Sequence, residues 1–455
     1  MSMRIEGNSN IVNISSGKFL KVEGPAYLEV LQGKITVLGK EVQIKEPIII
    51  PRSKVLVFNV ISSSIIKIKC GVGGYFEEIE EVLIPMEWRN IVTKVLEFKK
   101  PLVIMILGTV ESGKTTLCTF VANESFSKNY KTAVVDSDVG QSDLGPPATI
   151  GVGFLEREIT FLSEIPLFDI FFAGSTSPKE VYERILLSTR KAVDRALENG
   201  AEVIVVNTDG WISDIDAKKF KTSLILSIEP NVILCIQRYG ELESILKAFK
   251  NFSSINIFRL PPAKITKTKS KEERKLLREH AFARLFSDAK VISLNINRLS
   301  FLYSVFGSGL QITNNSLREY ESTLNIPIVY GESSTDFVFL VCKGSLNEEK
   351  IKNMKNILSS KNDKITPIIV DENFAKNILV GLFDSNHKFL GLGIIMDIDF
   401  YKRTIDIFTN VKESNVCTVA FGNIKLSEDG REIGKIDPWS FQDPTASNVL
   451  SSKRN

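Results

Sequence analysis

The sequence is poor in the residues that build metal centres and disulfide frameworks. It has two histidines, His280 and His387, in 455 residues, and its five cysteines are scattered singly with no CxxC pair. Structural zinc sites and disulfide scaffolds both need Cys or His residues clustered at short spacing. The sequence therefore argues against both classes and against a histidine-based catalytic triad. We interpret the cysteines as inert thiols in a reducing compartment.

Long hydrophobic runs are missing as well. No stretch approaches the run of about 20 apolar residues that a membrane-spanning helix needs, and the first residues, MSMRIEGNSNIV, lack the apolar core of a signal peptide. The net charge is only +3, so nucleic-acid binding cannot be argued from the total and any basic surface must be local. We expect no membrane association and a cytoplasmic location, or a nuclear one in a eukaryotic source.

The chain is too long for one ordinary hydrophobic core, so we expect two or three domains. The pattern of apolar and polar residues changes twice along it. Residues 1–85 are typical of short strands, with turns expected at Gly33 and Gly39. Residues 86–295 alternate apolar runs with helical stretches, which is typical of a parallel sheet covered on both sides. Residues 296–455 return to strands, with one helix predicted over 348–361. The prediction is an α/β protein whose central domain is flanked by two β-rich domains.

A phosphate-binding motif follows the first apolar run of the central region. Residues 108–115 read GTVESGKT, which matches GxxxxGK[ST], and a helical stretch comes next. In such a loop, glycines let backbone N–H groups turn toward phosphate oxygens, and the helix N-terminus adds a favourable dipole. We expect Lys114 to reach the β- and γ-phosphates and the Thr115 hydroxyl to ligate Mg²⁺. The predicted nucleotide-binding residues of this P-loop NTPase domain are Gly108, Thr109, Val110, Glu111, Ser112, Gly113, Lys114, Thr115 and Thr116.

Two carboxylates end the next apolar run, in TAVVDSDVGQ (132–141). The carboxyl ends of parallel strands form the ligand edge of an open sheet, and side chains at positions i and i+2 point the same way. Of Asp136 and Asp138, one is predicted to anchor Mg²⁺ or its waters and the other to accept a proton from an attacking hydroxyl. The residues alone leave open a loop with two solvated aspartates.

Two more motifs lie further along this region. FFAGSTSPKE (171–180) predicts a loop followed by a helix that begins at Pro178. VIVVNTDGWI (203–212) ends another apolar run at the same sheet edge. Trp211 there is either a buried anchor or an exposed aromatic side chain that stacks on a base.

A basic stretch over 261–286 is predicted to form a lid. Seven basic and two acidic residues lie within 264–278, and a helix here puts Arg274 and Arg278 one turn apart on one face. Their guanidiniums could close over a transferring phosphate. The alternative is a solvated amphipathic helix whose inward residues are Leu276, Leu277 and Leu285.

Taken in order, these pieces resemble the polynucleotide 5′-hydroxyl kinases, a family that includes the kinase subunit of the eukaryotic pre-mRNA cleavage machinery, ribosomal-RNA-processing kinases and archaeal members. The resemblance rests on GTVESGKTT, DSDVGQSDLGPPATIG, FAGSTSP, NTDGW and KSKEERKLLRE, and covers about residues 15–290. It implies transfer of the γ-phosphate of ATP, with Mg²⁺, to the 5′-hydroxyl end of RNA or DNA in RNA processing. The flanking β domains would then serve protein partners.

The resemblance also assigns roles to residues. Asp138 would orient and deprotonate the 5′-hydroxyl, and the segment 145–149 would form a clasp on the substrate. The implied catalytic residues are Lys114, Asp138, Arg274 and Arg278. The implied metal-binding residues are Thr115 and Asp136, and the implied substrate-binding residues are Gln141, Pro147, Thr149, Ser175 and Trp211. The family lid often carries further arginines, where this chain has Ala281 and then Arg284.

Two other functions compete with the kinase. A non-catalytic, ATP-bound assembly module would keep the nucleotide to stabilise its fold, but it would not need the paired aspartates and lid arginines. A GTPase-like switch would need an NKxD guanine-reading motif after a later strand, and CIQRYGEL (235–242) stands there instead.

Overall fold

The computed structural model describes residues 5–80, 84–264, 268–344, 346–361 and 364–442, so residues 265–267 of the predicted lid lie outside the described residues. The chain divides into two compact units. The first comprises Met1–Gly145, Thr149–Phe171 and Tyr182–Arg274, and the second comprises Pro146–Ala148, Phe172–Val181 and Lys275–Asn455. No helix within the described ranges is long and apolar enough to span a membrane.

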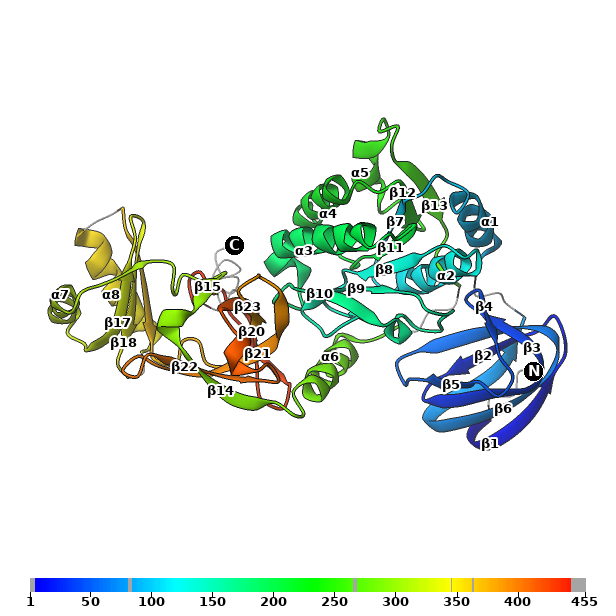
Figure 1. The fold of residues 1–455 in the computed structure, drawn as a ribbon, viewed down its shortest axis with the longest axis horizontal. Helices are drawn as coiled ribbons and strands as arrows, with labels where there is room; N and C mark the ends of the chain where they lie inside the picture. Colours follow the sequence, from blue (N-terminus) through cyan, green and yellow to red (C-terminus); the bar gives the residue numbers. More distant parts are fainter. Residues whose placement is uncertain (1–4, 81–83, 265–267, 345, 362–363, 443–455) are drawn as a thin grey trace, which may run out of the picture. The chain divides into compact units, whose positions relative to one another are not determined.

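The chain of the first unit begins with a six-stranded β-sheet (Figure 1). Its members are β1 (Ile5–Ile14), β2 (Phe19–Glu23), β3 (Ala26–Val37), β4 (Lys40–Val42), β5 (Pro47–Ile50) and β6 (Val55–Ile79). Buried and exposed side chains alternate along β2 and β3, because one face of each strand packs into the core.

The two turns predicted in this sheet have different outcomes. The turn expected at Gly33 is wrong: Gly33 lies inside β3, where the register against β6 shifts between Val30 and Lys34. A side chain at Gly33 would come within 2.3 Å of Ser64 Oγ, so the glycine permits a bulge. The second predicted turn is confirmed, because Leu38 and Gly39, both with positive φ, join β3 to β4.

The central sheet of the first unit has the order β10-β9-β8-β11-β7-β12-β13. The apolar runs predicted within residues 86–295 form β7 (Leu102–Gly108), β8 (Thr132–Asp136), β11 (Val203–Asn207), β12 (Val232–Ile236) and β13 (Asn256–Leu260). Neighbouring members of this set pair in parallel. The short strands β9 (Thr149–Phe154) and β10 (Leu167–Phe172) were not predicted, and β9 runs antiparallel to β8.

Helices cover both faces of the central sheet, with α1 and α2 on one side and α3 and α4 on the other (Figure 1). Their bounds are α1 (Met86–Val95), α2 (Lys114–Ser127), α3 (Pro178–Glu198), α4 (Ile215–Ile228) and the short α5 (Glu243–Leu246). This cover explains why every residue of β7, β8, β11 and β12 is buried and apolar runs are continuous there.

The second unit contains two further sheets. The larger has β14 (Lys290–Asn295), β15 (Ser300–Leu302), β20 (Ile378–Phe383), β21 (Phe389–Asp399), β22 (Thr404–Thr409), β23 (Thr418–Leu426) and β24 (Glu432–Lys435). The smaller has β16 (Leu310–Gln311), β17 (Ile328–Ser333), β18 (Phe337–Cys342) and β19 (Thr366–Asp371), with α7 (Asn314–Leu324) and α8 (Glu348–Lys361). The helix predicted over 348–361 is confirmed, whereas α7 was not predicted.

The three-domain division at residues 85 and 295 stays a prediction. One strand lies differently from it: β14, which the division assigned to the kinase domain, pairs with β22 in the larger sheet of the second unit.

The predicted lid helix is α6 (Lys271–Leu285), and the boundary between the two units falls inside it, between Arg274 and Lys275. The alternative with inward leucines is wrong for two of them, because Leu276 and Leu277 are 53% and 38% exposed. Phe282 is the buried residue of this helix, and Leu285 packs partly buried beside it.

Candidate active site

The phosphate loop has the expected strand–loop–helix setting. It leaves β7 at Gly108 and enters α2 at Lys114, through Glu111 at φ 62° and Gly113 at φ 101°. A left-handed backbone favours glycine at the second position. The Nζ atom of Lys114 donates to the carbonyl oxygen of Thr109 at 2.6 Å, so the lysine folds back over its own loop.

Burial controls the charge of Lys114. The side chain is 7% exposed, and this burial lowers its pKa from 10.5 to about 8, although the carboxylates of Asp138 and Asp209 act in the opposite direction. The cation of Lys221 adds to the lowering. The ammonium of Lys114 is therefore poised to gain stability from a nearby anion.

Asp136 lies at the end of β8 and is fully buried. Its Oδ2 atom accepts from the backbone N–H groups of Asp143 and Leu144, at 2.7 and 3.2 Å, and its Oδ1 atom accepts from Asn207 Nδ2 at 3.0 Å. Burial, together with the nearby charges of Asp138 and Asp143, raises the pKa of Asp136 to about 7. These hydrogen bonds hold the 137–144 loop around the carboxylate of Asp136 and connect that carboxylate to β11.

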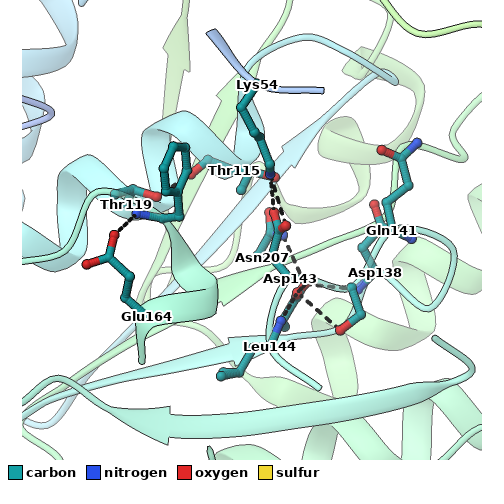
Figure 2. A network of polar contacts seen from close by, with 12 residues as sticks. Lys54, Thr115, Thr119, Asp138, Gln141, Asp143, Leu144, Glu164 and Asn207 are labelled. Atoms are coloured by element: carbon teal, nitrogen blue, oxygen red, sulfur yellow. Dashed lines mark hydrogen bonds and ion pairs between the residues drawn. The ribbon is translucent and has the colours of Figure 1, made fainter. Parts of the chain in front are cut away.

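Asp138 is held by the turn that follows it. Its Oδ1 atom accepts from the backbone N–H groups of Gly140 and Gln141, both at 3.1 Å, while no hydrogen bond from the described part of the chain reaches Oδ2. Burial and the charge of Asp209 raise its pKa, and Lys114 opposes the rise. Figure 2 shows Asp138 and Gln141 together on this turn. Asp138 is half-buried, and this arrangement leaves its Oδ2 atom available to accept a proton.

The N-terminal sheet reaches this loop through an ion pair. Lys54, which lies between β5 and β6, places Nζ 2.9 and 2.8 Å from the two carboxylate oxygens of Asp143, as Figure 2 shows. Both side chains are about a quarter exposed or less. Because the backbone N–H of Asp143 is itself bonded to Asp136, Lys54 supports the loop that carries both site carboxylates.

The NTDGW motif forms a second buried network beside the phosphate loop. Asp209 Oδ2 accepts from Lys221 Nζ at 2.6 Å, and both side chains are buried. Asp209 Oδ1 accepts from the backbone N–H of Trp211 at 2.9 Å. Lys221 therefore holds the carboxylate of Asp209 in place, and this carboxylate in turn holds the turn before Trp211.

Trp211 combines features of both readings that the sequence left open. Its ring stacks on Phe220 with centroids 5.9 Å apart, and its Nε1 atom donates to Asp214 Oδ2 at 2.9 Å. The side chain nevertheless stays half-buried. It is anchored at one side and keeps exposed surface.

The phosphate loop packs closely on its neighbours. A Cβ atom at Gly210 would come within 2.5 Å of the backbone nitrogen of Val110, so the NTDGW turn tolerates only glycine there. The Oε1 atom of Glu111 accepts from the backbone N–H of Lys269 at 2.6 Å. The segment that leads into α6 is thus tied to the tip of the phosphate loop.

Several predicted site residues belong to the second unit. These are Pro147, Ser175 and Arg278, whereas Thr149 and Arg274 belong to the first. Ser175 is buried; its Oγ atom donates to Glu180 Oε2 at 2.8 Å and accepts from Ser177 N at 3.0 Å. The side chains of Pro147 and Thr149 are buried as well.

The polar groups of the site suit a nucleoside triphosphate that brings its own cation better than a metal ion held by protein side chains alone. Within the described ranges, no group of three or more His, Cys, Asp or Glu residues is placed to hold a metal by itself. Ser112 Oγ in the phosphate loop and Asn207 Oδ1 beside Asp136 are buried and find no hydrogen-bond partner in the described part of the chain. Such orphaned atoms are expected next to a ligand or its waters.

Sequence reasoning missed three supporting residues: Lys54, Asn207 and Lys221. Lys221 carried a readable signal, since it shares a helix face with Ala217, Leu224 and Ile228, all buried. A lysine on an apolar face needs a buried partner. Lys54 carried none, because its partner lies 89 residues away.

A family model described as "mRNA cleavage and polyadenylation factor CLP1 P-loop" matches residues 108–288. The polyribonucleotide 5′-hydroxyl-kinase of Methanocaldococcus jannaschii is 35% identical over 359 residues, which cover 78% of this chain and 95% of the relative. The polyribonucleotide 5′-hydroxyl-kinase of Pyrococcus abyssi is 29% identical over 365 residues, which cover 78% of this chain and 96% of the relative.

Among solved structures, that of the wild-type Clp1p–Pcf11p complex matches with a TM-score of 0.61 at 12% identity. It covers 92% of this chain and 99% of that one. A likeness at this identity shows the fold alone.

The fold and the phosphate loop define a P-loop nucleotide-binding protein. Within that class, the chain belongs to the polyribonucleotide 5′-hydroxyl-kinase family, and the resemblance seen in its motifs is confirmed. It is accordingly an enzyme of the phosphotransferase class.

Replacing Lys221 by Met is expected to lower the free energy of unfolding by about 3–5 kcal/mol, because Asp209 is left charged and buried without its cation. Urea unfolding followed by fluorescence measures the change. Lys219→Met is the matched control on the same helix; its ion pair with Asp216 is exposed and contributes at most about 1 kcal/mol. Equal effects of the two substitutions would contradict the role given to Lys221.

The affinity of the free enzyme for a nucleoside triphosphate is expected to fall as the pH rises through about 8. The pKa of Lys114 is lowered to about 8, so the ammonium loses its proton there rather than near 10.5, and the phosphates lose a cation. Calorimetric titration of ATP from about pH 7.5 to about pH 10 measures the fall. Lys114→Arg stays charged throughout, and any affinity it retains should not decline. A flat profile for the natural protein would refute the expectation.

Proposed function

We propose that the protein is an ATP- and Mg²⁺-dependent kinase that phosphorylates the 5′-hydroxyl end of RNA, DNA or both, within RNA processing. The observation that carries the proposal is the Asp138 carboxylate. One of its oxygens is fixed by two backbone N–H groups, and the other stands at the sheet edge that carries the phosphate loop. The names of the archaeal relatives support a polyribonucleotide acceptor.

In the proposed reaction, the oxygen of the 5′-hydroxyl attacks the γ-phosphorus of ATP while Asp138 accepts the proton of that hydroxyl. The bond between the γ-phosphorus and the bridging oxygen breaks, and ADP leaves. The raised pKa of Asp138 makes its carboxylate a better base than an exposed aspartate. Because one oxygen is already held by Gly140 and Gln141, little reorientation is needed during the transfer.

Charge neutralisation falls to the phosphate loop. Lys114 would leave the Thr109 carbonyl for the β- and γ-phosphates, and residues 108–116 would surround the phosphates with backbone N–H groups. The Thr115 hydroxyl would hold Mg²⁺, which would supply positive charge to the phosphates. Since both oxygens of Asp136 are already occupied, we assign this residue to a water of the ion and to holding the loop.

The acceptor would be held by Trp211, by Gln141 and by the clasp at 145–149. An aromatic side chain that is anchored by a neighbouring ring and is only half-buried suits a terminal base, whose stacking contributes about 1–3 kcal/mol. Arg274 and Arg278 would complete the site from α6 by neutralising the transferring phosphoryl group. The flanking β-rich regions would bind protein partners.

The direct test mixes the protein, Mg²⁺ and ATP labelled in its γ-phosphate with 5′-hydroxyl oligonucleotides. Label is expected at the 5′ end, and Lys114→Ala should lose it. Asp138→Asn should lower kcat by about 10²-fold or more while ATP still binds, because the base is lost and the phosphate loop is intact. Matched RNA and DNA strands in one assay would establish the preferred acceptor.

Asp216→Asn serves as the control, because Asp216 is an exposed carboxylate on α4 outside the proposed machinery; it should label normally. Tight binding of ATP without label transfer under any divalent metal would favour the non-catalytic assembly module. Unchanged labelling by Asp138→Asn would remove the assigned base.

A further inference from the structure

Three chain segments, which we call the acceptor side, carry residues that the family resemblance assigns to the polynucleotide end or to the transferring phosphate. They belong to the second unit rather than to the unit with the phosphate loop. They are Pro146–Ala148 of the clasp, Phe172–Val181 with Ser175, and α6 from Lys275 onward. The first two are joined directly, since the backbone N–H groups of Ala173 and Gly174 both donate to the carbonyl oxygen of Ala148, at 3.0 and 2.9 Å. The question is what holds these segments in one arrangement.

The hairpin of β23 and β24 holds the segment 172–181. The backbone N–H of Asn423 in β23 donates to the carbonyl oxygen of Gly174 at 2.7 Å. A Cβ atom at Gly422 would lie 2.6 Å from that same oxygen, so the two backbones are in close contact. In β24, Lys435 forms an ion pair with Glu180, and Glu180 also accepts from Ser175 Oγ.

The same hairpin holds the lid helix. Arg278 binds Glu432 of β24 in a bidentate pair, with Nε–Oε1 at 2.5 Å and Nη2–Oε2 at 3.0 Å. The backbone N–H of Glu432 donates to Glu279 Oε1 at 3.0 Å. At the turn of the hairpin, a Cβ atom on Gly430 would meet the backbone nitrogen of Ala283 at 2.4 Å.

The bidentate pair orients Arg278 but does not use all of its N–H donors. A guanidinium has five N–H donors, and Glu432 takes one from Nε and one from Nη2. Within the described residues, Nη1 and the second hydrogen of Nη2 have no partner, and they remain for a phosphate. The two side chains are 18% and 16% exposed, so the pair is held more firmly than a surface ion pair.

We propose that the β23–β24 hairpin is the positioning element of the acceptor side. In it, Glu432 orients the lid arginine Arg278 for the transferring phosphate, and Lys435 orients the Ser175 segment for the polynucleotide end. Both are positioning residues, since they act through Arg278 and through Glu180. The inference rests on the proposed kinase function, and it gives the C-terminal unit a part in the reaction.

The test measures steady-state kinetics of full-length variants with ATP and a 5′-hydroxyl oligonucleotide. Glu432→Gln should lower kcat roughly 10–100-fold, as misplacing a catalytic group by about 1 Å does, with the KM for ATP within about twofold. Lys435→Met should instead raise the KM for the oligonucleotide several-fold, and Lys435→Arg should restore it.

Asp429→Asn is the matched control. It breaks an exposed ion pair with Arg431 on the same hairpin. Within the described residues, the Asp429 side chain bonds to Ser427 and Arg431 and to neither α6 nor the 172–181 segment, so its kinetics should equal those of the natural protein. Thermal unfolding midpoints and ATP binding are measured for every variant, so that a loss of fold is not read as a loss of positioning.

Arg278→Ala separates this inference from the proposed function. Full activity of Arg278→Ala would remove the lid arginine from the mechanism itself. A strong loss for Arg278→Ala together with natural kinetics for Glu432→Gln would overturn the positioning role alone. A rise in kcat for Glu432→Gln would overturn it too, because Glu432 would then be withholding the arginine from the phosphate.

Discussion

The carboxylate of Asp136 is the constraint on which the rest of the site depends. A fully buried carboxylate is costly unless its oxygens are hydrogen-bonded, and here two backbone N–H groups and the amide of Asn207 meet that need. Satisfying Asp136 forces the 137–144 loop to turn back over the end of β8. The turn in between presents Asp138, and Lys54 secures the far end through Asp143. The position of the proposed base, Asp138, thus follows from the hydrogen bonds that the buried carboxylate of Asp136 needs.

The division of the chain adds a second constraint. The first unit holds the phosphate loop, both site carboxylates and Trp211, while the second holds most of the lid helix and the Ser175 segment. The chain passes between the units more than once, at 145–149, at 171–182 and inside α6. These crossings coincide with the proposed clasp, the Ser175 motif and the proposed lid. The two units are therefore covalently joined at motifs that lie far apart in the sequence, from Gly145 to Lys275.

The sequence predicted the features that are local. The parallel strands, the phosphate loop, the start of α3 at Pro178 and the span of α8 follow from short-range patterns. What escaped prediction depends on distant partners. Gly33 has the look of a turn residue, but its place in a bulge depends on β6. The pairing of β14 with β22 joins segments more than 100 residues apart. The Lys54–Asp143 and Arg278–Glu432 pairs likewise leave no trace in local sequence.

The buried pair of Asp209 and Lys221 bears on why such a site keeps polar groups in its interior. Replacing a buried ion pair with well-packed apolar residues is often neutral or stabilising, so stability alone is a weak reason to retain it. This pair has a second connection: Asp209 also accepts from the backbone N–H of Trp211, and its charge acts on Lys114 and Asp138. An apolar substitute would preserve the core but release the NTDGW turn and change the charge beside the phosphates. Positioning, rather than stability, is the physical reason for a lysine on the buried face of α4.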